Sequence, residues 1–418
     1  MNREPTQKPT VPEAAGSHLS ARQRAQIAAA VRRCLPESVS ISEDGLLDIF
    51  ARGAWSGIAE PGDKVVHIVC ERIGPWRALG ALLDSVEADS LIAFLDNPDD
   101  LLREQIAEAV TRWAARLSLD EAIAHFERAS RIGAVIVTPE MPQWPAGLER
   151  LGLHAPCALW ARGRLHALDS LERSVSVVGA RASTGYGEHV TAELVNALVD
   201  RGFTIVSGAA YGIDGMAHRC TLAADGTTIA VLAGGIDRLY PSGHDALLRR
   251  IIDTGLVLAE LPCGFAPTKW RFLQRNRLIA SLTQATIVIE AGWRSGSLNT
   301  AHHALDMNIP VGVVPGPVTS PSSAGCHRLL RETPATCVTS AGEIIELVLP
   351  EKMESPVVLE AIHPLALRVL DATSSQTPRQ PKRIAHEAGI SEEDARKALS
   401  LLALNGSVRE QLNGWTRA

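Results

Sequence analysis

The chain has 418 residues, of which 46% are hydrophobic and 21% are charged, and its formal net charge is −6 at pH 7. This composition predicts a globular protein long enough for two or three domains, and no run of about 18 apolar residues indicates a membrane span. Residues 1–18 are polar and contain several prolines but no apolar segment of the signal-peptide type, so we expect a disordered tail and a cytoplasmic protein.

The seven cysteines indicate a reducing compartment. They are an odd number, lie far apart and include no CxxC pair. This spacing argues against both a disulfide framework and a zinc site, so we expect no metal ion.

Residues 19–130 are expected to form an N-terminal helical domain. Asp63 follows a Pro-Gly pair and is a suitable N-cap for one helix, and Gly74-Pro75 separates that helix from the next. A Gly-Pro break between two short helices is typical of a small helical bundle. Its turn could contact a nucleic-acid backbone, although a plain turn between helices is the simpler interpretation.

Residues 131–349 alternate between short β-branched runs and helical stretches. The expected strands are 174–178, 203–206, 227–232, 256–261, 285–289 and 310–314, with amphipathic segments at 188–200, 244–254 and 298–307. Apolar strands separated by helices pair in parallel and are covered by helices on both faces. The expected fold class is therefore α/β with a Rossmann-like core.

Residues 350–362 are expected to be a linker, and residues 363–418 a winged-helix domain. The pattern predicts helices at 363–373, 382–389 and 391–404, followed by a strand-like segment at 407–412. Three short helices and a hairpin are the winged-helix arrangement. The third helix begins with acids, which suit a helix N-terminus but repel phosphates. A protein-contact or weak DNA-binding module is therefore favoured.

Glycine-rich segments follow the first strands of the core. In doubly wound sheets ligands bind beyond the carboxyl ends of the strands, and glycine lets backbone N–H groups approach an anion closely. The candidate residues in these loops are Gly179, Arg181, Ser207, Gly208, Tyr211, Gly212, Ser295, Gly296 and Ser297. The alternative for each glycine is a tight strand–helix turn. No Walker A motif and no complete dinucleotide fingerprint is present, so no nucleotide cofactor is expected.

Positive charge is concentrated at 269–277, in a chain that is acidic overall. The candidate residues there are Lys269, Arg271, Arg275, Asn276 and Arg277, and no acid occurs between Glu260 and Glu290. Cations without neighbouring acids favour a polyanion that binds there, although a solvated surface cluster is the alternative. The aromatic residues Trp270, Phe272, Tyr211 and Trp293 could stack on bases, as in single-stranded nucleic-acid binding, or could be core anchors.

These motifs resemble those of the DNA-processing A family, also called DprA or Smf. The matching segments occur in family order and include Val177-Val178-Gly179-Ala180-Arg181, Ser207-Gly208, Gly212-Ile213-Asp214, Tyr240-Pro241, Arg275-Asn276-Arg277, Ser295-Gly296-Ser297-Leu298 and Val314-Pro315-Gly316. The resemblance implies an extended Rossmann core between a SAM-like helical domain and the winged helix. It further implies a non-enzymatic homodimer that binds and protects single-stranded DNA and loads the RecA recombinase during natural transformation and homologous recombination.

By position, Arg181 and the 269–277 stretch carry over from this family as DNA contacts. Tyr211 stands where the family usually has an arginine, and could replace a phosphate contact with a stacked base. Gly179-Ala180-Arg181 replaces the family's Gly-Ser-Arg, and Gly325-Cys326-His327 replaces a Gly-Thr-Asn.

The main alternative is an enzyme, a LOG-like nucleotide phosphoribohydrolase on a related Rossmann fold. Such a hydrolase needs a carboxylate near the oxocarbenium-like centre. The helix expected after Gly296 carries no acid before Asp306, and we interpret Glu290 as a residue that orients the strand end. A third possibility is an adaptor for other proteins, against which the concentrated cations argue.

Overall fold

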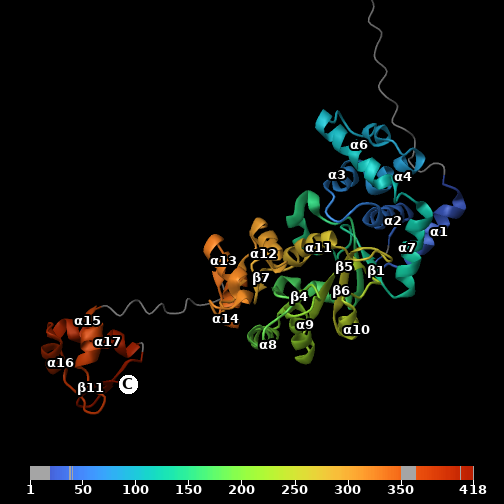
Figure 1. Ribbon diagram of the computed structural model, residues 1–418. Helices are drawn as coiled ribbons and strands as arrows, with labels where there is room; N and C mark the ends of the chain where they lie inside the picture. Colours follow the sequence, from blue (N-terminus) through green and yellow to red (C-terminus); the bar gives the residue numbers. More distant parts are fainter. Residues whose placement is uncertain (1–18, 37–38, 40, 350–363, 405, 418) are drawn as a thin grey trace, which may run out of the picture. The chain divides into compact units, whose positions relative to one another are not determined.

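The computed structural model describes residues 19–36, 39, 41–349, 364–404 and 406–417 (Figure 1). The chain divides into two compact units, residues 1–348 and 349–418. The expected tail at 1–18 and the expected linker at 350–362 lie outside the described residues. The helical segment and the sheet both belong to the first unit.

Seven helices precede the sheet in the described part of the chain. They are α1 (Ala21–Arg32), α2 (Glu43–Ile58), α3 (Lys64–Ile73), α4 (Pro75–Asp84), α5 (Ala88–Ile92), α6 (Asp100–Ala114) and α7 (Leu119–Arg131). Asp63 caps α3 by accepting a hydrogen bond from the Val65 N–H at 2.9 Å, as the sequence predicts. Gly74 has a φ of 96°, ends α3 and redirects the chain into α4. These helices share one buried apolar cluster with strand residues such as Ala259, so they pack directly on the sheet.

The central sheet has nine strands in the described residues. They are β1 (Val135–Val137), β2 (Leu159–Gly163), β3 (Ser174–Val178), β4 (Thr204–Ser207), β5 (Thr228–Gly235), β6 (Leu256–Leu261), β7 (Ala285–Val288), β8 (Val311–Val313) and β9 (Thr336–Cys337). Their order is β1-β2-β6-β5-β4-β3-β7-β8-β9. Pairing is parallel from β6 to β9, and β1 and β2 add antiparallel strands at one edge. The six expected strands and the α/β class are confirmed, whereas β1, β2 and β9 were not anticipated.

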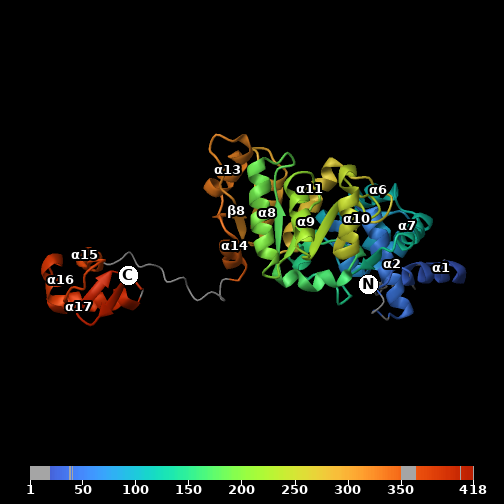
Figure 2. The ribbon, with the colours of Figure 1, turned by 90° about the horizontal axis from the view of Figure 1, so that it is seen from below.

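Helices cover both faces of this sheet. α8 (Gly185–Val199), α9 (Ile213–Ala223) and α10 (Asp245–Thr254) lie on one face, and α11 (Lys269–Ser281) and α12 (Ser297–Asp306) lie on the other (Figures 1 and 2). The remaining helices of this unit in the described residues are α13 (Ala324–Glu332) and α14 (Ala341–Val348). There are also four 3-10 segments, η1 (Ala146–His154), η2 (Leu165–Arg173), η3 (Ser242–His244) and η4 (Pro321–Ser323). Successive side chains of β5 point to opposite faces of the sheet. Val231 belongs to the same buried cluster as Ile279 of α11, and Leu232 belongs to the cluster that includes Ile251 of α10. No helix in the described ranges is long and apolar enough to cross a membrane.

The strand order places a topological switch between β3 and β7. From β3 the chain adds β4, β5 and β6 on one side, and it then returns to place β7 on the other side of β3. The loops after β3 and β7 therefore diverge, and a crevice opens at their carboxyl ends. This is the position at which open α/β sheets bind ligands.

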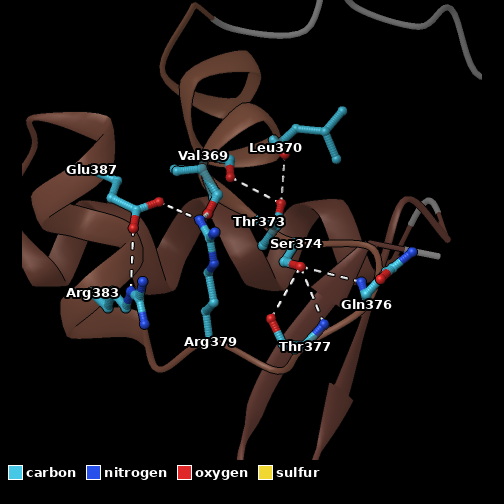
Figure 3. A network of polar contacts seen from close by, with 10 residues as sticks. Val369, Leu370, Thr373, Ser374, Gln376, Thr377, Arg379, Arg383 and Glu387 are labelled. Atoms are coloured by element: carbon cyan, nitrogen blue, oxygen red, sulfur yellow. Dashed lines mark hydrogen bonds and ion pairs between the residues drawn. The ribbon is translucent and has the colours of Figure 1, made fainter.

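The second unit consists of three helices and a hairpin. Its elements are α15 (Pro364–Ala372), α16 (Pro381–Ala388), α17 (Glu392–Leu404), β10 (Val408–Gln411) and β11 (Gly414–Arg417), and the two strands pair antiparallel. Their order is the one expected from the sequence. Arg379 donates to the Ala372 carbonyl at 2.8 Å. It also pairs with Glu387, which pairs with Arg383 at 3.2 Å (Figure 3). Backbone hydrogen bonds between Arg379 and Trp415 attach the hairpin to the loop that follows α15.

Candidate nucleic-acid interface

A pocket of about 930 Å³ lies at the switch between β3 and β7. Its walls come from the β3–α8 loop (179–182), the β7–α12 loop (292–296) and the first turn of α11, and Tyr240 contributes from the β5–α10 loop. The glycine-rich loops after β3 and β7 therefore meet at one site, as the sequence predicts.

Three exposed cations converge on this pocket. Arg181, Lys269 and Arg294 all line it, and no ion pair within the described ranges involves any of them. The Arg181 guanidinium lies 4.9 Å from the centroid of the Phe272 ring, and the Tyr240 ring packs against Phe272 at 5.7 Å. The cation–π contact holds Arg181 at the wall without neutralising its charge.

Arg294 was missed by the sequence reasoning. It lies outside the 269–277 stretch and follows Trp293 in the loop that contains Ser295 and Gly296. Its position directly before a glycine-rich strand-end loop was the available signal, but an isolated arginine produces no local excess of charge.

The expectation that the 269–277 cations lack compensating acids is wrong for Arg271 and Arg277. Arg271 donates to both carboxylate oxygens of Glu60, at 2.8 and 3.1 Å, and Arg277 donates to both oxygens of Glu260, at 2.6 and 2.7 Å. The arginines are only 7% and 3% exposed, and neither lines the pocket. Burial acts to raise the pKa of Glu60, but hydrogen bonds from Arg271 and Arg116 outweigh it and lower that pKa. The acids come from other parts of the fold, so the local sequence does not show the neutralisation.

Arg275 lies at the inner wall of the pocket and is 5% exposed. It donates to the Gly208 carbonyl at 2.7 Å and to the Val231 carbonyl, and thereby links β4 to β5. Burial lowers its pKa to about 10, against the opposing effect of the Asp214 carboxylate. A Cβ on Gly208 would lie 2.4 Å from the guanidinium, so this glycine is required for the arginine to fit.

Two buried polar residues fix the loops that frame the pocket. The Asn276 amide donates to the Gly296 carbonyl at 3.2 Å and to the Asn299 side chain at 3.1 Å. Glu290, which is 2% exposed, accepts hydrogen bonds from the backbone N–H and the hydroxyl of Thr184. The geometry confirms that Glu290 orients the strand-end loops.

The β4–α9 loop contributes Ala210 to the pocket lining and contacts the neighbouring loops. The Ser207 hydroxyl donates to the Val177 carbonyl at 2.7 Å. Gly212 has a φ of 75°, and a Cβ there would lie 2.1 Å from the Ala180 carbonyl oxygen. The Tyr211 hydroxyl accepts from the Gly243 N–H at 3.2 Å, and its ring lies edge-on to His244 at 4.8 Å. These residues hold loops together, and their contact with DNA stays a prediction.

The structure thus separates the candidate residues into two groups. Gly179, Arg181, Lys269, Arg275, Asn276, Ser295, Gly296 and Ser297 line the pocket. Ser207, Gly208, Tyr211, Gly212, Arg271 and Arg277 are not among its lining residues.

Comparison with known proteins places the chain in a family. The family described as DNA recombination-mediator protein A matches residues 135–349, which run from β1 beyond α14 and include the pocket. A relative from Mycobacterium tuberculosis that carries the DprA name is 45% identical over 317 residues, which cover 72% of this chain and 76% of the relative. The chain belongs to the DprA/Smf family.

Other DprA proteins agree with this assignment. The DNA processing protein DprA of Bacillus subtilis is 37% identical over 210 residues, covering 50% of this chain and 69% of that protein. The X-ray structure of DprA from Streptococcus pneumoniae superimposes with a TM-score of 0.58 at 29% identity, over 73% of this chain and 98% of that one. The mostly parallel sheet with its helices is therefore a fold shared with a DprA protein.

Proposed function

We propose that this DprA/Smf protein binds single-stranded DNA in the pocket between β3 and β7. The observation that carries the proposal is the convergence of Arg181, Lys269 and Arg294 on one pocket, exposed and outside any ion pair of the described chain. Lysine and arginine side chains supply the phosphate affinity of nucleic-acid binding proteins. Backbone N–H groups of the glycine-rich loops and the N-terminus of α12 add further positive potential.

Aromatic side chains at the same site favour a single strand over a duplex. Tyr240 lines the pocket and is 47% exposed, and Trp270, beside Lys269, is 55% exposed. Stacking on such rings is worth about 1–3 kcal/mol per base and requires unpaired bases. A duplex offers its phosphates but not its base faces.

The family description of a recombination mediator supports a wider role. In this role the protein acts as a cytoplasmic homodimer that protects incoming DNA and loads the RecA recombinase onto it, during natural transformation and homologous recombination. The α1–α7 region would be the SAM-like domain of the family.

The second unit would be a winged-helix domain with a protein-contact role. Glu392 and Glu393 at the start of α17 pair with Arg396 and Lys397 one turn later, at 2.8 Å each. With Asp394, α17 carries three acids against these two cations, so it lacks the excess positive charge that suits a helix inserted into the major groove. The same charge balance suits a surface that contacts another protein.

The phosphoribohydrolase alternative is disfavoured by the carboxylates around the pocket. Asp214 is the only acid among the described lining residues, and it is 6% exposed. It accepts from the Gly208 and Ala210 N–H groups at 3.2 and 3.4 Å, and so acts as a loop anchor. The Glu290 carboxylate accepts hydrogen bonds from Thr184 on both of its oxygens. Neither carboxylate is placed to stabilise an oxocarbenium-like centre.

A salt titration with single- and double-stranded DNA tests the proposed function. We expect the full-length protein to bind a fluorescent dT oligomer more tightly than a duplex of equal length, with an affinity that falls as salt rises. Equal affinity for the two, or no binding at low salt, would contradict the proposal. Rapid base release from nucleoside monophosphates would favour the enzyme instead.

A further inference from the structure

Five aromatic side chains are exposed in the described part of the chain, and all five lie at the carboxyl edge of the sheet. They are Tyr186, Tyr211, Tyr240, Trp270 and Trp293, with exposed fractions of 40%, 47%, 47%, 55% and 52%. The set includes all three tyrosines of the protein. Tyr211, Tyr240 and Trp293 lie in the connections after β4, β5 and β7, whereas Tyr186 and Trp270 lie in the first turns of α8 and α11, the helices that follow β3 and β6.

The order of the strands in the sheet determines the order of these aromatic side chains along its edge. The strands that precede these aromatics are neighbours in the order β6-β5-β4-β3-β7, so the side chains follow the edge as Trp270, Tyr240, Tyr211, Tyr186 and Trp293. Adjacent strands lie about 4.8 Å apart, so the row of strand ends spans roughly 19 Å. The pocket takes lining residues from the connections after all five of these strands, but Tyr240 is the only member of the set among them.

Contacts with neighbouring loops and helices hold four of the five rings in place. The Tyr186 hydroxyl donates to the Pro315 carbonyl, and the Tyr211 hydroxyl accepts from the Gly243 N–H. Tyr240 packs against Phe272, and the Arg328 guanidinium lies 4.9 Å from the Trp293 ring centroid. Rings that are already ordered lose little conformational entropy when a ligand stacks on them.

The exposed cations lie close in sequence to three of these rings. Lys269 directly precedes Trp270, Arg294 directly follows Trp293, and Arg181 lies in the loop that leads to Tyr186. Sequence-independent single-strand binding surfaces combine a basic path for the backbone with aromatic platforms for successive bases. An aromatic patch for a protein partner is the competing interpretation, but it would not require cations without acidic partners.

We propose that the aromatic edge, defined as Tyr186, Tyr211, Tyr240, Trp270 and Trp293, is a base-stacking track for several nucleotides around the pocket. This inference rests on the proposed function, because the pocket must first hold the phosphates of the strand. The track gives the site its preference for unpaired bases without reading their sequence. It also gives Tyr211 a role in base stacking rather than in phosphate binding.

An abasic oligomer separates stacking from phosphate binding. The full-length protein is titrated with a fluorescent dT oligomer and with an abasic deoxyribose-phosphate oligomer of the same length at fixed salt. We expect the wild type to prefer the dT oligomer by at least about tenfold, since each stacked base contributes roughly fivefold or more and the edge offers several rings. We expect Trp270→Ala and Trp293→Ala each to lower dT affinity about tenfold and to leave the abasic affinity unchanged.

Three further variants control for packing and for exposure. Trp→Phe at either position should keep most of the dT affinity, because the ring remains. Leu101→Ala removes a side chain that is 62% exposed on α6, away from the edge, and should have no effect.

Equal wild-type affinity for both oligomers, or an equal loss of both affinities in the tryptophan variants, would overturn the proposed stacking track. Loss of self-association with unchanged DNA binding would overturn it in favour of a protein contact. Binding of neither oligomer would instead contradict the proposed function.

Discussion

Glu260 receives hydrogen bonds from Arg277 on both carboxylate oxygens, at 2.6 and 2.7 Å, and both side chains are buried. Burial raises the pKa of Glu260 in spite of the neighbouring guanidinium. The pair therefore has a substantial desolvation cost, and its charges are not available to a ligand. The positive charge of α11 divides into a buried structural part, which includes Arg277, and an exposed part at Lys269.

Replacing Arg277 by Met should destabilise the fold rather than the DNA complex. Removing one partner of a buried pair leaves an uncompensated charge and costs about 3–5 kcal/mol. Urea denaturation should show this loss in the free energy of unfolding, and the double variant with Glu260→Leu should recover part of it. Weaker DNA binding with unchanged stability would make Arg277 a DNA contact after all.

Gly208→Ala should also destabilise the protein, by about 1–3 kcal/mol, because the new methyl group overpacks the site. The added Cβ would lie 2.4 Å from the Arg275 guanidinium, which is held by two carbonyl groups. Gly185→Ala is the matched control, since no neighbouring atom lies within 4 Å of a Cβ at that position. Equal melting temperatures for the two variants would show that Arg275 moves freely.

Stability should decrease on acidification because of His218. This side chain is 0% exposed, and burial lowers its pKa to about 3. The unfolded chain binds this proton near pH 6.5, so the stabilisation is complete above that pH and is lost as the pH falls toward 3. Between these two pH values the free energy of unfolding falls by up to about 1.4 kcal/mol per pH unit. Urea denaturation at pH 7, 6 and 5 should show a steeper decline for the wild type than for His218→Gln, and parallel curves would contradict the assignment.

Asn276→Ala should weaken DNA binding without changing its salt dependence. The Asn276 amide braces the β7–α12 loop through Gly296 and Asn299 but carries no charge. Each lost hydrogen bond is worth about 1 kcal/mol, so we expect a loss of several-fold in affinity for a dT oligomer. Anisotropy at several salt concentrations provides both quantities, and a shallower salt slope would show that the loop brace also positions cations.

Local patterns in the sequence were sufficient for most of the fold. The β-branched runs predicted the six central strands, and caps such as Asp63 located helix starts. β1 and β9 contain only three and two residues, too few to produce a periodic pattern. β2 joins the sheet antiparallel to β6, a pairing that depends on tertiary contacts and not on its own composition.

The candidate site could be predicted only in part, because charge compensation depends on the whole fold. The strand-end loops located the pocket correctly, since parallel strands place their carboxyl ends at one edge. The count of acids between Glu260 and Glu290 could not reveal Glu60, which reaches Arg271 from the loop between α2 and α3. Arg294 lies outside the 269–277 stretch and adds no local excess of charge. Its place in the site follows from its position on the pocket wall.

The most direct test of the central claim removes the three exposed cations together. Arg181→Ala, Lys269→Ala and Arg294→Ala are combined in one variant, and Arg22→Ala, Arg32→Ala and Arg72→Ala, exposed residues on α1 and α3, form a control with the same change in net charge. Each phosphate contact contributes about 0.7 to the slope of log affinity against log salt for single strands. We therefore expect the pocket variant to bind a dT oligomer more weakly and to lose up to about 2 from this slope, while the control behaves as the wild type. Unchanged affinity and slope in the pocket variant, or equal losses in both, would contradict the assignment of this pocket as the DNA site.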